Sequence, residues 1–433
     1  MGRLLGVGVL ALGLLVAAGP TTRPLGLVGS DRQAKELVGI IVEPDVGTTL
    51  TRLGEGLDPF GPRLRVGYAD AWTIAPEGRI AALSTHPTET TTTLDAIRFV
   101  ALGSLRLVPR PIALRGIGLT LFWPTNDRIL ALVQSCCSAT DETSVAVVDP
   151  GARRIVSRVA LGGDAVAWTR AGDRLIVLVT PTNTIGPARL VVVAPDGRTR
   201  TAKLDRIAAG RSWPEDQTEP RLGTQRIPAL AADSETGRAY VIQPDGVAAE
   251  IPLDSLAVSY HELASASLAA RLSSWLQPNA EAKGMNGTSW RGQSLGNGFV
   301  AVTGTVERAI VNGNSEEMTS APAGLAIVDV RDWTIRTLDR GADDVAVTDG
   351  LLLATGRSWT SAQQQTPSGM GLAAYGSDTK LRFHVFEGGS AWVQQTWNGR
   401  AYVLVDGKTT VVELATGRVV EQRADTTPWL LLP

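Results

Sequence analysis

Residues 119–161 decide the fold, and they read LTLFWPTNDRILALVQSCCSATDETSVAVVDPGARRIVSRVAL. The segment holds four apolar stretches, which are separated by the turn Asn126-Asp127, a polar loop and Pro150-Gly151. Short runs rich in β-branched residues between turn residues are typical of β-strands. The segment therefore predicts four consecutive strands, at 119–123, 128–133, 144–149 and 155–161.

The same unit recurs along the chain. The turn between the first and second stretches recurs at Gly78, Asp127, Gly172, Gly237, Gly298, Gly350 and Gly399, at intervals of 49, 45, 65, 61, 52 and 49 residues. Most intervals match the period of about 40–50 residues that four-stranded propeller blades show. A single four-stranded sheet cannot bury both faces, but sheets stacked in a closed ring can. We therefore expect an all-β protein with a single β-propeller.

The two ends of the chain are expected to close the ring. A lone apolar strand at 428–432 ends the sequence, and three strands at 37–42, 48–53 and 63–67 begin it. One C-terminal plus three N-terminal strands would complete a blade and remove the exposed edges. With seven full repeats and this split one, we expect eight four-stranded blades, with seven as the runner-up.

The repeats resemble the YVTN-type and WD-like β-propeller repeats of exported bacterial proteins. The resemblance rests on the RAYV motif at 238–241 and again at 400–403, on AIVD at 326–329 and on LATGRVV at 414–420. The Gly-His and Trp-Asp dipeptides of true WD repeats are absent from the sequence. The resemblance implies a fold and no activity, because propellers serve many functions.

The N-terminus is typical of an export signal. Arg3 precedes an apolar run at 4–18, which at 15 residues is shorter than the roughly 20 that cross a bilayer. We expect a signal peptide at 1–18, a linker at 19–35 and the propeller at 36–433. An uncleaved signal anchor is the alternative. Because of this export signal, we expect the protein to lie outside the cytoplasm, in the periplasm or the cell wall, or to be secreted.

Composition limits the partners. The hydrophobic share of 44% can fill a core, and the charged share of 19% argues against disorder. The net charge of −2 with scattered arginines argues against nucleic acid as the main partner, because phosphate binding needs a concentrated basic face. We expect no stable membrane span after signal cleavage, and a monomer that binds a protein, peptide or glycan of the cell envelope.

Two of the repeats are longer than the others. The segment at 206–226 is polar and contains proline, and we expect a surface loop there. In the segment at 263–276, Leu268, Leu272, Trp275 and Leu276 fall at helical spacing, and Pro278 follows. We expect a short amphipathic helix over 263–276 that packs on one face of the ring.

Cys136 and Cys137 are the two cysteines of the chain. In an exported protein they favour a disulfide. Adjacent Cα atoms lie about 3.8 Å apart, below the usual disulfide separation, so a bond between them would be strained. We expect a vicinal disulfide, with two free thiols or a metal or redox role as the alternatives.

No motif predicts catalysis. The GQSLG segment at 292–296 matches the serine elbow of α/β hydrolases, but it leads into a strand and not into the helix that the elbow requires. The histidines, His86, His261 and His384, show no metal-ligand spacing. For His261 we favour a packing role over a catalytic one. No phosphate loop or paired-carboxylate pattern stands out. We expect no catalytic residue, no metal and no cofactor.

Tryptophans concentrate in the expected inner strands, at 72, 123, 168, 290, 392, 397 and 429. Near them, polar groups such as Arg170, Gln394 and Gln395 would suit a sugar, a peptide or a planar cofactor. Packing between blades is the alternative role. The two long insertions could form one binding face, with aromatic and arginine side chains of the kind that dominate interfaces. Its expected members are Trp213, Trp275, Trp290, Arg211, Arg291 and His261.

The sequence favours a non-catalytic extracytoplasmic binding or scaffold propeller whose ligand is unknown. A propeller enzyme is the alternative, either quinoprotein-like dehydrogenase or, less well supported by so few histidines, a lactonase or lyase. The tryptophan-docking motif of the quinoprotein family ends in Trp after Thr-Gly, whereas Thr416-Gly417 is followed here by Arg418.

Overall fold

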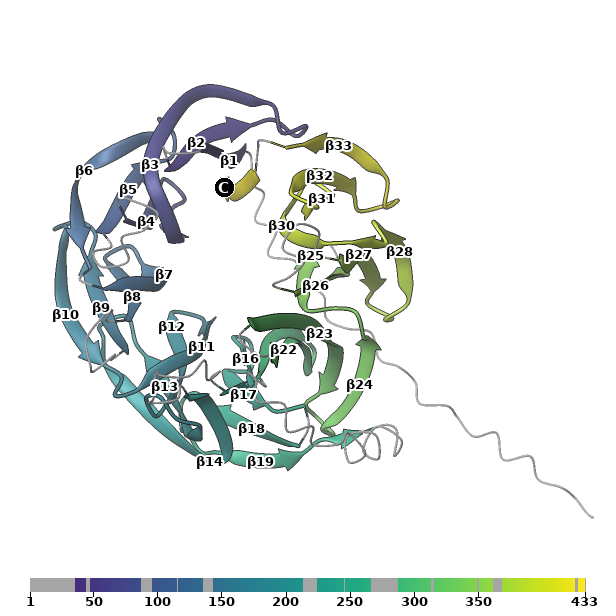
Figure 1. Ribbon diagram of the computed structural model, residues 1–433. Helices are drawn as coiled ribbons and strands as arrows, with labels where there is room; N and C mark the ends of the chain where they lie inside the picture. Colours follow the sequence, from purple (N-terminus) through teal and green to yellow (C-terminus); the bar gives the residue numbers. More distant parts are fainter. Residues whose placement is uncertain are drawn as a thin grey trace, which may run out of the picture.

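The computed structural model describes residues 36–43, 47–86, 96–114, 116–134, 143–212, 224–244, 246–265, 287–312, 315–348, 350–360, 368–424 and 427–432. The regular elements of these ranges are β-strands, and no α-helix occurs within them. Figure 1 shows the sheets arranged side by side in a ring. This arrangement confirms the predicted all-β propeller. The expected signal peptide (1–18) and linker (19–35) lie outside the described residues.

The first sheet contains seven strands in the order β34-β1-β2-β3-β4-β5-β6. These are β1 (Glu36–Glu43), β2 (Gly47–Leu53), β3 (Pro59–Ile74), β4 (Ile80–His86), β5 (Ala96–Ala101), β6 (Arg106–Ala113) and β34 (Thr427–Leu432). The long strand β3 pairs with β2 as far as Gly67 and with β4 from Tyr68 onward. One strand therefore joins two neighbouring repeats in a single sheet.

Three sheets consist of four antiparallel strands each, in the orders β10-β9-β8-β7, β16-β17-β18-β19 and β30-β31-β32-β33. The first comprises β7 (Ile117–Thr125), β8 (Arg128–Gln134), β9 (Thr143–Asp149) and β10 (Arg154–Ala160). The second comprises β16 (Ala229–Asp233), β17 (Arg238–Ile242), β18 (Val247–Pro252) and β19 (Ser259–Glu262). The third comprises β30 (Ala391–Trp397), β31 (Arg400–Val405), β32 (Lys408–Glu413) and β33 (Val419–Arg423). In Figure 1, β7, β16 and β30 lie toward the middle of the ring and β10, β19 and β33 at its rim.

The remaining sheet has fifteen strands. They are β11 (Asp164–Ala171), β12 (Arg174–Thr180), β13 (Gly186–Val193), β14 (Thr199–Ser212), β15 (Thr224–Ile227), β20 (Ala264–Ser265), β21 (Gly287–Gly296), β22 (Phe299–Asn312), β23 (Ser315–Asp329), β24 (Thr334–Asp339), β25 (Asp344–Thr348), β26 (Leu351–Thr360), β27 (Ser368–Gly376), β28 (Leu381–Val385) and β29 (Gly388–Gly389). Strand β14 continues past β13 to pair with β15, which pairs in parallel with β21. Strand β23 also reaches β26 through Thr319 and Ser320.

The predicted number of blades is wrong. If one continuous hydrogen-bonded sheet is taken as one blade, the described strands form a ring of five blades, and not the expected eight or the seven that was the runner-up. The reason is the length of β3, β14 and β23, which carry backbone hydrogen bonds from one repeat into the next. The turn spacing counts repeats, and it does not reveal where a strand continues across a repeat boundary.

The expected joining of the two chain ends is observed. Strand β34 pairs antiparallel with β1, from Glu36 opposite Leu432 to Ile40 opposite Thr427. A second seam lies between the last sheet and the first, where Tyr402 is fully buried in a cluster with Leu53, Leu57, Trp397 and Val411. At this seam Arg400 forms an ion pair of 3.1 Å with Glu55.

The core lies between neighbouring sheets. The second strand of a four-strand unit is buried on both faces, as in β8, where all but the two end residues are buried, and in β12, where all but Arg174 are. Leu130 and Val147 of one sheet cluster with Val177 and Val191 of the next. Each fully buried aliphatic side chain contributes about 1.5–3 kcal/mol. Stacking of the sheets in a ring therefore stabilises strands in which apolar residues follow one another without alternating with polar ones.

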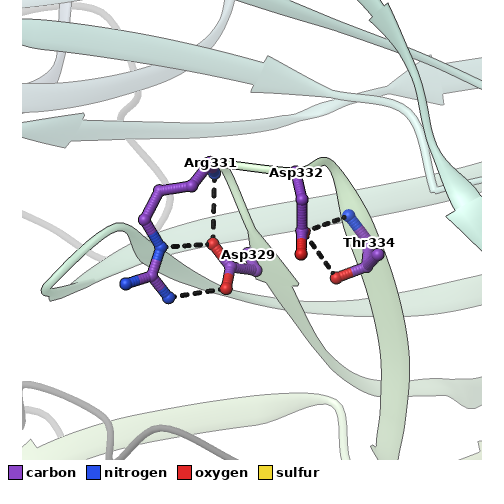
Figure 2. A network of polar contacts seen from close by, with 4 residues as sticks. All are labelled: Asp329, Arg331, Asp332 and Thr334. Carbon is purple, nitrogen blue, oxygen red and sulfur yellow. Dashed lines mark hydrogen bonds and ion pairs between the residues drawn. The ribbon is translucent and has the colours of Figure 1, made fainter. Parts of the chain in front are cut away.

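Aspartates at the ends of strands, or in the turns after them, fix those turns. The carboxylate of Asp329 accepts hydrogen bonds from the backbone N–H of Arg331 at 3.1 Å and from its Nε at 2.7 Å, and Asp332 accepts from the backbone N–H of Thr334 at 3.0 Å (Figure 2). Asp149 and Asp233 accept backbone N–H groups in the same way at 2.8 and 2.9 Å. The recurring aspartate is therefore a turn residue, as Asx-turn chemistry requires.

The two long repeats differ from expectation where they are described. Residues 206–212 extend β14 and 224–226 begin β15, so the expected loop over 206–226 is partly strand. Of the expected helix over 263–276, Leu263 is buried without regular structure and Ala264–Ser265 forms β20, which pairs with β24. The rest lies outside the described residues. Within the described ranges, no helix is long and apolar enough to cross a membrane.

Candidate functional site

Three side chains of different chemistry lie at one level of three successive repeats. Arg291 of β21 is opposite Thr303, Asp344 of β25 is opposite Thr355, and Trp392 of β30 is opposite Leu404. The partner strands β22, β26 and β31 begin at Phe299, Leu351 and Arg400, and each partner residue lies four positions after that first residue. Because the strands pair in the same manner, this shared register puts the three residues side by side.

Contacts join the three residues into one group. Arg291 Nη1 lies 3.7 Å from Asp344 Oδ1, and the indole N–H of Trp392 donates a hydrogen bond to the Asp344 carboxylate. Trp392 is 42% exposed and the Arg291 side chain is 72% exposed, whereas only 22% of the Asp344 side chain is exposed. The group therefore offers an accessible aromatic ring and an accessible guanidinium around a half-buried carboxyl.

Asp343 adds a second carboxyl behind the first. It is 6% exposed, its Oδ2 accepts the backbone N–H of Arg357 at 3.2 Å, and its buried Oδ1 has no hydrogen-bond partner. Burial raises the pKa of Asp343, although the Arg357 guanidinium opposes the shift. Burial likewise raises the pKa of Asp344, against Arg291. Two adjacent carboxyls that both resist ionisation are costly to keep in a fold.

The Arg357 guanidinium connects the second carboxyl with the aromatic ring. Its Nε lies 3.9 Å from Asp343 Oδ2, and its Cζ lies 5.6 Å from the centroid of the Trp392 ring. The Trp392 indole is thus held by the hydrogen bond to Asp344 and by the cation above its face. We call Arg291, Asp343, Asp344, Arg357 and Trp392 the carboxylate site.

Glycines allow the backbone around the carboxylate site to come close. A Cβ on Gly356, next to Arg357, would lie 1.7 Å from the carbonyl oxygen of Gly341. A Cβ on Gly369 would lie 2.2 Å from the carbonyl oxygen of Gly356. The N–H of Asp343 donates to the Thr355 carbonyl at 2.9 Å. The backbone segments of this repeat around Gly341, Gly356 and Gly369 therefore lie closer together than residues with a Cβ would allow.

The expected binding face is distributed over several strands. Arg291 belongs to the carboxylate site, but the ring of Trp290 packs over Gly304 and is partly buried in the core. Arg211 is exposed in β14, where it pairs with Gln225. His261 lies in the rim strand β19 (Figure 1). Trp213 and Trp275 lie outside the described residues, so the face as a whole stays a prediction.

His261 packs against the next sheet. Its ring stacks on Trp333 with centroids 4.0 Å apart and planes 10° apart, and Nε2 lies 3.3 Å from Glu250. Burial lowers the pKa of His261, which favours the neutral ring. Glu250 is also paired with Arg238. These contacts agree with the packing role that the sequence favoured over a catalytic one.

The inner-strand tryptophans divide into buried ones, which pack in the core, and exposed ones, for which a binding role stays a prediction. Trp123 and Trp397 are buried, and Trp123 meets Phe99 edge to face at 6.0 Å. Trp72, Trp168 and Trp392 are 37%, 39% and 42% exposed. Of these three, Trp392 contacts Asp344 and Arg357 of the carboxylate site.

The serine elbow is absent from the GQSLG segment. Ser294 lies within β21, opposite Val300 of β22, so no helix follows it. The expected vicinal disulfide of Cys136 and Cys137 falls outside the described residues and stays a prediction, which thiol counting on the unreduced, denatured chain would test. Among the described residues, no three His, Cys, Asp or Glu side chains are grouped so as to hold a metal ion.

Asp343 and Asp344 were not predicted from the sequence, in which no paired-carboxylate pattern stood out. Their signal was present, because two aspartates follow Gly341-Ala342 directly before an inner strand. Elsewhere an aspartate near a glycine fixes a turn, so composition alone does not distinguish the two uses. Arg291 and Trp392 were singled out, but not as neighbours.

Comparisons with known proteins agree on the fold. No protein-family model matches the chain, and no curated protein matches its sequence. Among solved structures, the dihydro-heme d1 dehydrogenase NirN in complex with DHE is similar over 94% of this chain and 77% of its own, with 12% identity and a TM-score of 0.53. The quinohemoprotein alcohol dehydrogenase ADHIIG from Pseudomonas putida HK5 shows 8% identity, coverage of 82% and 68%, and a TM-score of 0.45.

Saccharomyces cerevisiae Sqt1 shows 10% identity, coverage of 84% and 87%, and a TM-score of 0.45. At such identities the similarity to NirN shows the fold alone, and it supports the predicted resemblance to propeller-repeat proteins. The narrower expectation of a YVTN-type, exported bacterial protein stays a prediction.

Proposed function

We propose that this propeller-repeat protein is a non-catalytic binding protein, and that its ligand contacts the carboxylate site. The observation that carries the proposal is the shared level of Arg291, Asp344 and Trp392, which gathers an exposed aromatic ring with charged donors and acceptors. Binding sites commonly combine an apolar surface with a few fixed polar groups. On the evidence of residues 1–18, the proposal places the protein outside the cytoplasm.

The energetics of Asp343 support a functional role for the site. A buried carboxyl whose Oδ1 has no partner costs free energy that an apolar residue of similar size would not. Such costs concentrate where a protein acts on other molecules. Asp343 therefore fits a site kept for its chemistry better than one kept for stability.

The pKa values of the two carboxyls favour binding over acid–base catalysis. Carboxyl pairs that perform hydrolysis need one acid and one ionised base, so their surroundings drive the two pKa values apart. Here burial raises the pKa of both Asp343 and Asp344. The two groups are also adjacent in the chain, and burial shifts both pKa values in the same direction.

The test is saturation-transfer NMR on the purified propeller with three probes of different charge, namely cellobiose, choline and succinate. We expect one probe to bind the wild type, to lose at least about tenfold in affinity in Trp392→Ala, and to bind Trp168→Ala normally. Trp168 is the matched control because it is a similarly exposed inner-strand tryptophan outside the site.

Absence of binding by every probe would contradict the proposal, as would equal losses in the two tryptophan variants. Conversion of a bound probe to product in the same sample would show a propeller enzyme and overturn the non-catalytic assignment.

A further inference from the structure

We propose that the ligand of the carboxylate site is a neutral saccharide, an inference that rests on the proposed binding function. The site presents one flat apolar surface, Trp392, beside hydrogen-bonding groups of both kinds. A pyranose ring has the complementary build, because one face carries C–H groups and its edge carries hydroxyls. The following steps take the aromatic ring, the charges and the buried carboxyl in turn.

The Trp392 ring is a fixed surface. Its N–H is engaged by Asp344, and the Arg357 guanidinium lies 5.6 Å from its centroid. Both contacts restrict rotation of the indole, yet 42% of the residue remains accessible. A pre-positioned aromatic face loses little conformational entropy when a ligand stacks on it. Stacking of sugar C–H groups on that face is therefore favourable.

The charges of the site balance. The guanidiniums of Arg291 and Arg357 pair with the carboxyls of Asp344 and Asp343, at 3.7 and 3.9 Å. A cationic ligand would meet an arginine next to each carboxyl, and an anionic ligand would meet a carboxyl next to each arginine. A neutral ligand avoids both repulsions. The 3.7 Å separation of Arg291 and Asp344 is also longer than a hydrogen bond, so these two exposed or half-buried groups keep donors and acceptors for a ligand.

Hydroxyl groups use such a mixed site fully. Each hydroxyl donates one hydrogen bond and accepts others. A hydroxyl that donates to the Asp344 carboxyl can accept from the Arg291 guanidinium, whose side chain is 72% exposed. Two adjacent hydroxyls match the parallel N–H groups of a guanidinium. An amine offers no acceptor and a carboxylate no donor, so neither would satisfy both partners.

Asp343 supplies an observation independent of the exposed groups. It is more than nine-tenths buried directly behind Asp344, and its Oδ1 has no partner. Burial and the charge of Asp344 both raise the pKa of Asp343, because like charges repel, and burial raises the pKa of Asp344 itself. Burial thus works against the charged form of Asp344, while its carboxyl still accepts hydrogen bonds, and this favours a neutral, hydroxyl-rich ligand over a cation.

The experiment measures affinities of cellobiose, maltose and chitobiose, with choline and succinate as charged comparators. We expect a disaccharide to bind, with saturation transfer strongest to the C–H protons of one ring face. Asp344→Asn and Trp392→Ala should each weaken binding at least about tenfold, which is about 1.4 kcal/mol. Trp392→Phe should restore part of the affinity, and Trp168→Ala should leave it unchanged.

The outcomes separate this inference from the binding function. Binding of choline or succinate with the same dependence on Trp392 would refute the saccharide class and leave the binding function standing. Binding of no probe would refute both. Circular dichroism of each variant checks the fold, and Trp392→Phe keeps the test decisive if the alanine variant does not fold.

Discussion

Two aspartates of this chain have pKa values shifted in opposite directions, and the surroundings of each carboxyl cause the shift. At the exposed turn after β9, the N–H of Ala152 holds the pKa of Asp149 below its usual value, so the ionised form is the stable one. At Asp343, burial raises the pKa, and one oxygen is left without a partner. The ionised first aspartate therefore supports the fold, whereas burial makes the ionised second one costly.

Replacement of Asp343 by asparagine should stabilise the protein at neutral pH. The folded state raises the pKa of Asp343 above the ordinary 3.8, so the folded chain holds this proton more tightly than the unfolded chain. The associated stability is present at low pH and is lost as the pH rises through the folded-state pKa. Denaturant titrations should show Asp343→Asn gaining stability over the wild type between about pH 4 and about pH 7.

Asp173→Asn, in the exposed turn between β11 and β12, is the control and should show no such trend. A loss of stability in Asp343→Asn at neutral pH would mean that the ion pair with Arg357 outweighs burial. The same variant should bind the ligand of the carboxylate site more weakly.

At the scale of strands, close backbone contacts shape the site as much as side chains do. Gly356 of β26 lies against the backbone of Gly341, and Gly369 of β27 lies against the backbone of Gly356. Arg357 follows Gly356 directly. A side chain at either glycine would separate the strands that hold Asp343 and Arg357. The geometry of the carboxylate site thus depends on two glycines, Gly356 and Gly369, that are not members of the site.

Gly356→Ala should therefore destabilise the protein and weaken binding together. The added Cβ would lie 1.7 Å from a backbone oxygen that cannot rotate away, and overpacking of this kind costs about 1–3 kcal/mol. Gly246→Ala is the matched control, because a Cβ there meets nothing within 4 Å. Equal unfolding midpoints for the two variants would refute the argument.

At the scale of the whole molecule, ring closure depends on the pairing of β34 with β1. Removal of residues 427–433 should leave β1 with an unpaired edge and reduce the protection of its amides in hydrogen exchange. We expect amides of β8 and β12, which lie far along the chain, to change much less. Unchanged protection of β1 in the truncated chain would show that the seam around Tyr402 suffices for closure.

The ring could be predicted from the sequence because the features that indicate it are local and recur along the chain. Strand patterns and turn glycines recur in each repeat, and β34 and β1 were matched as the two halves of one sheet. Two features are not local. The continuation of β3 through Gly67 into a second repeat depends on pairing partners, and it made the blade number wrong. The meeting of Arg291, Asp344 and Trp392 depends on register between distant strands.

The pairing of β34 with β1 also governs the order of events during synthesis. The ribosome makes β1 first, but its neighbour at one edge, β34, is the last described strand to emerge. Contacts between such distant segments form slowly, since a long chain must be closed before they stabilise anything. Until then β1 presents unpaired backbone groups that other chains can pair with. A nascent chain of this kind would benefit from a chaperone that covers its N-terminal strands until translation ends.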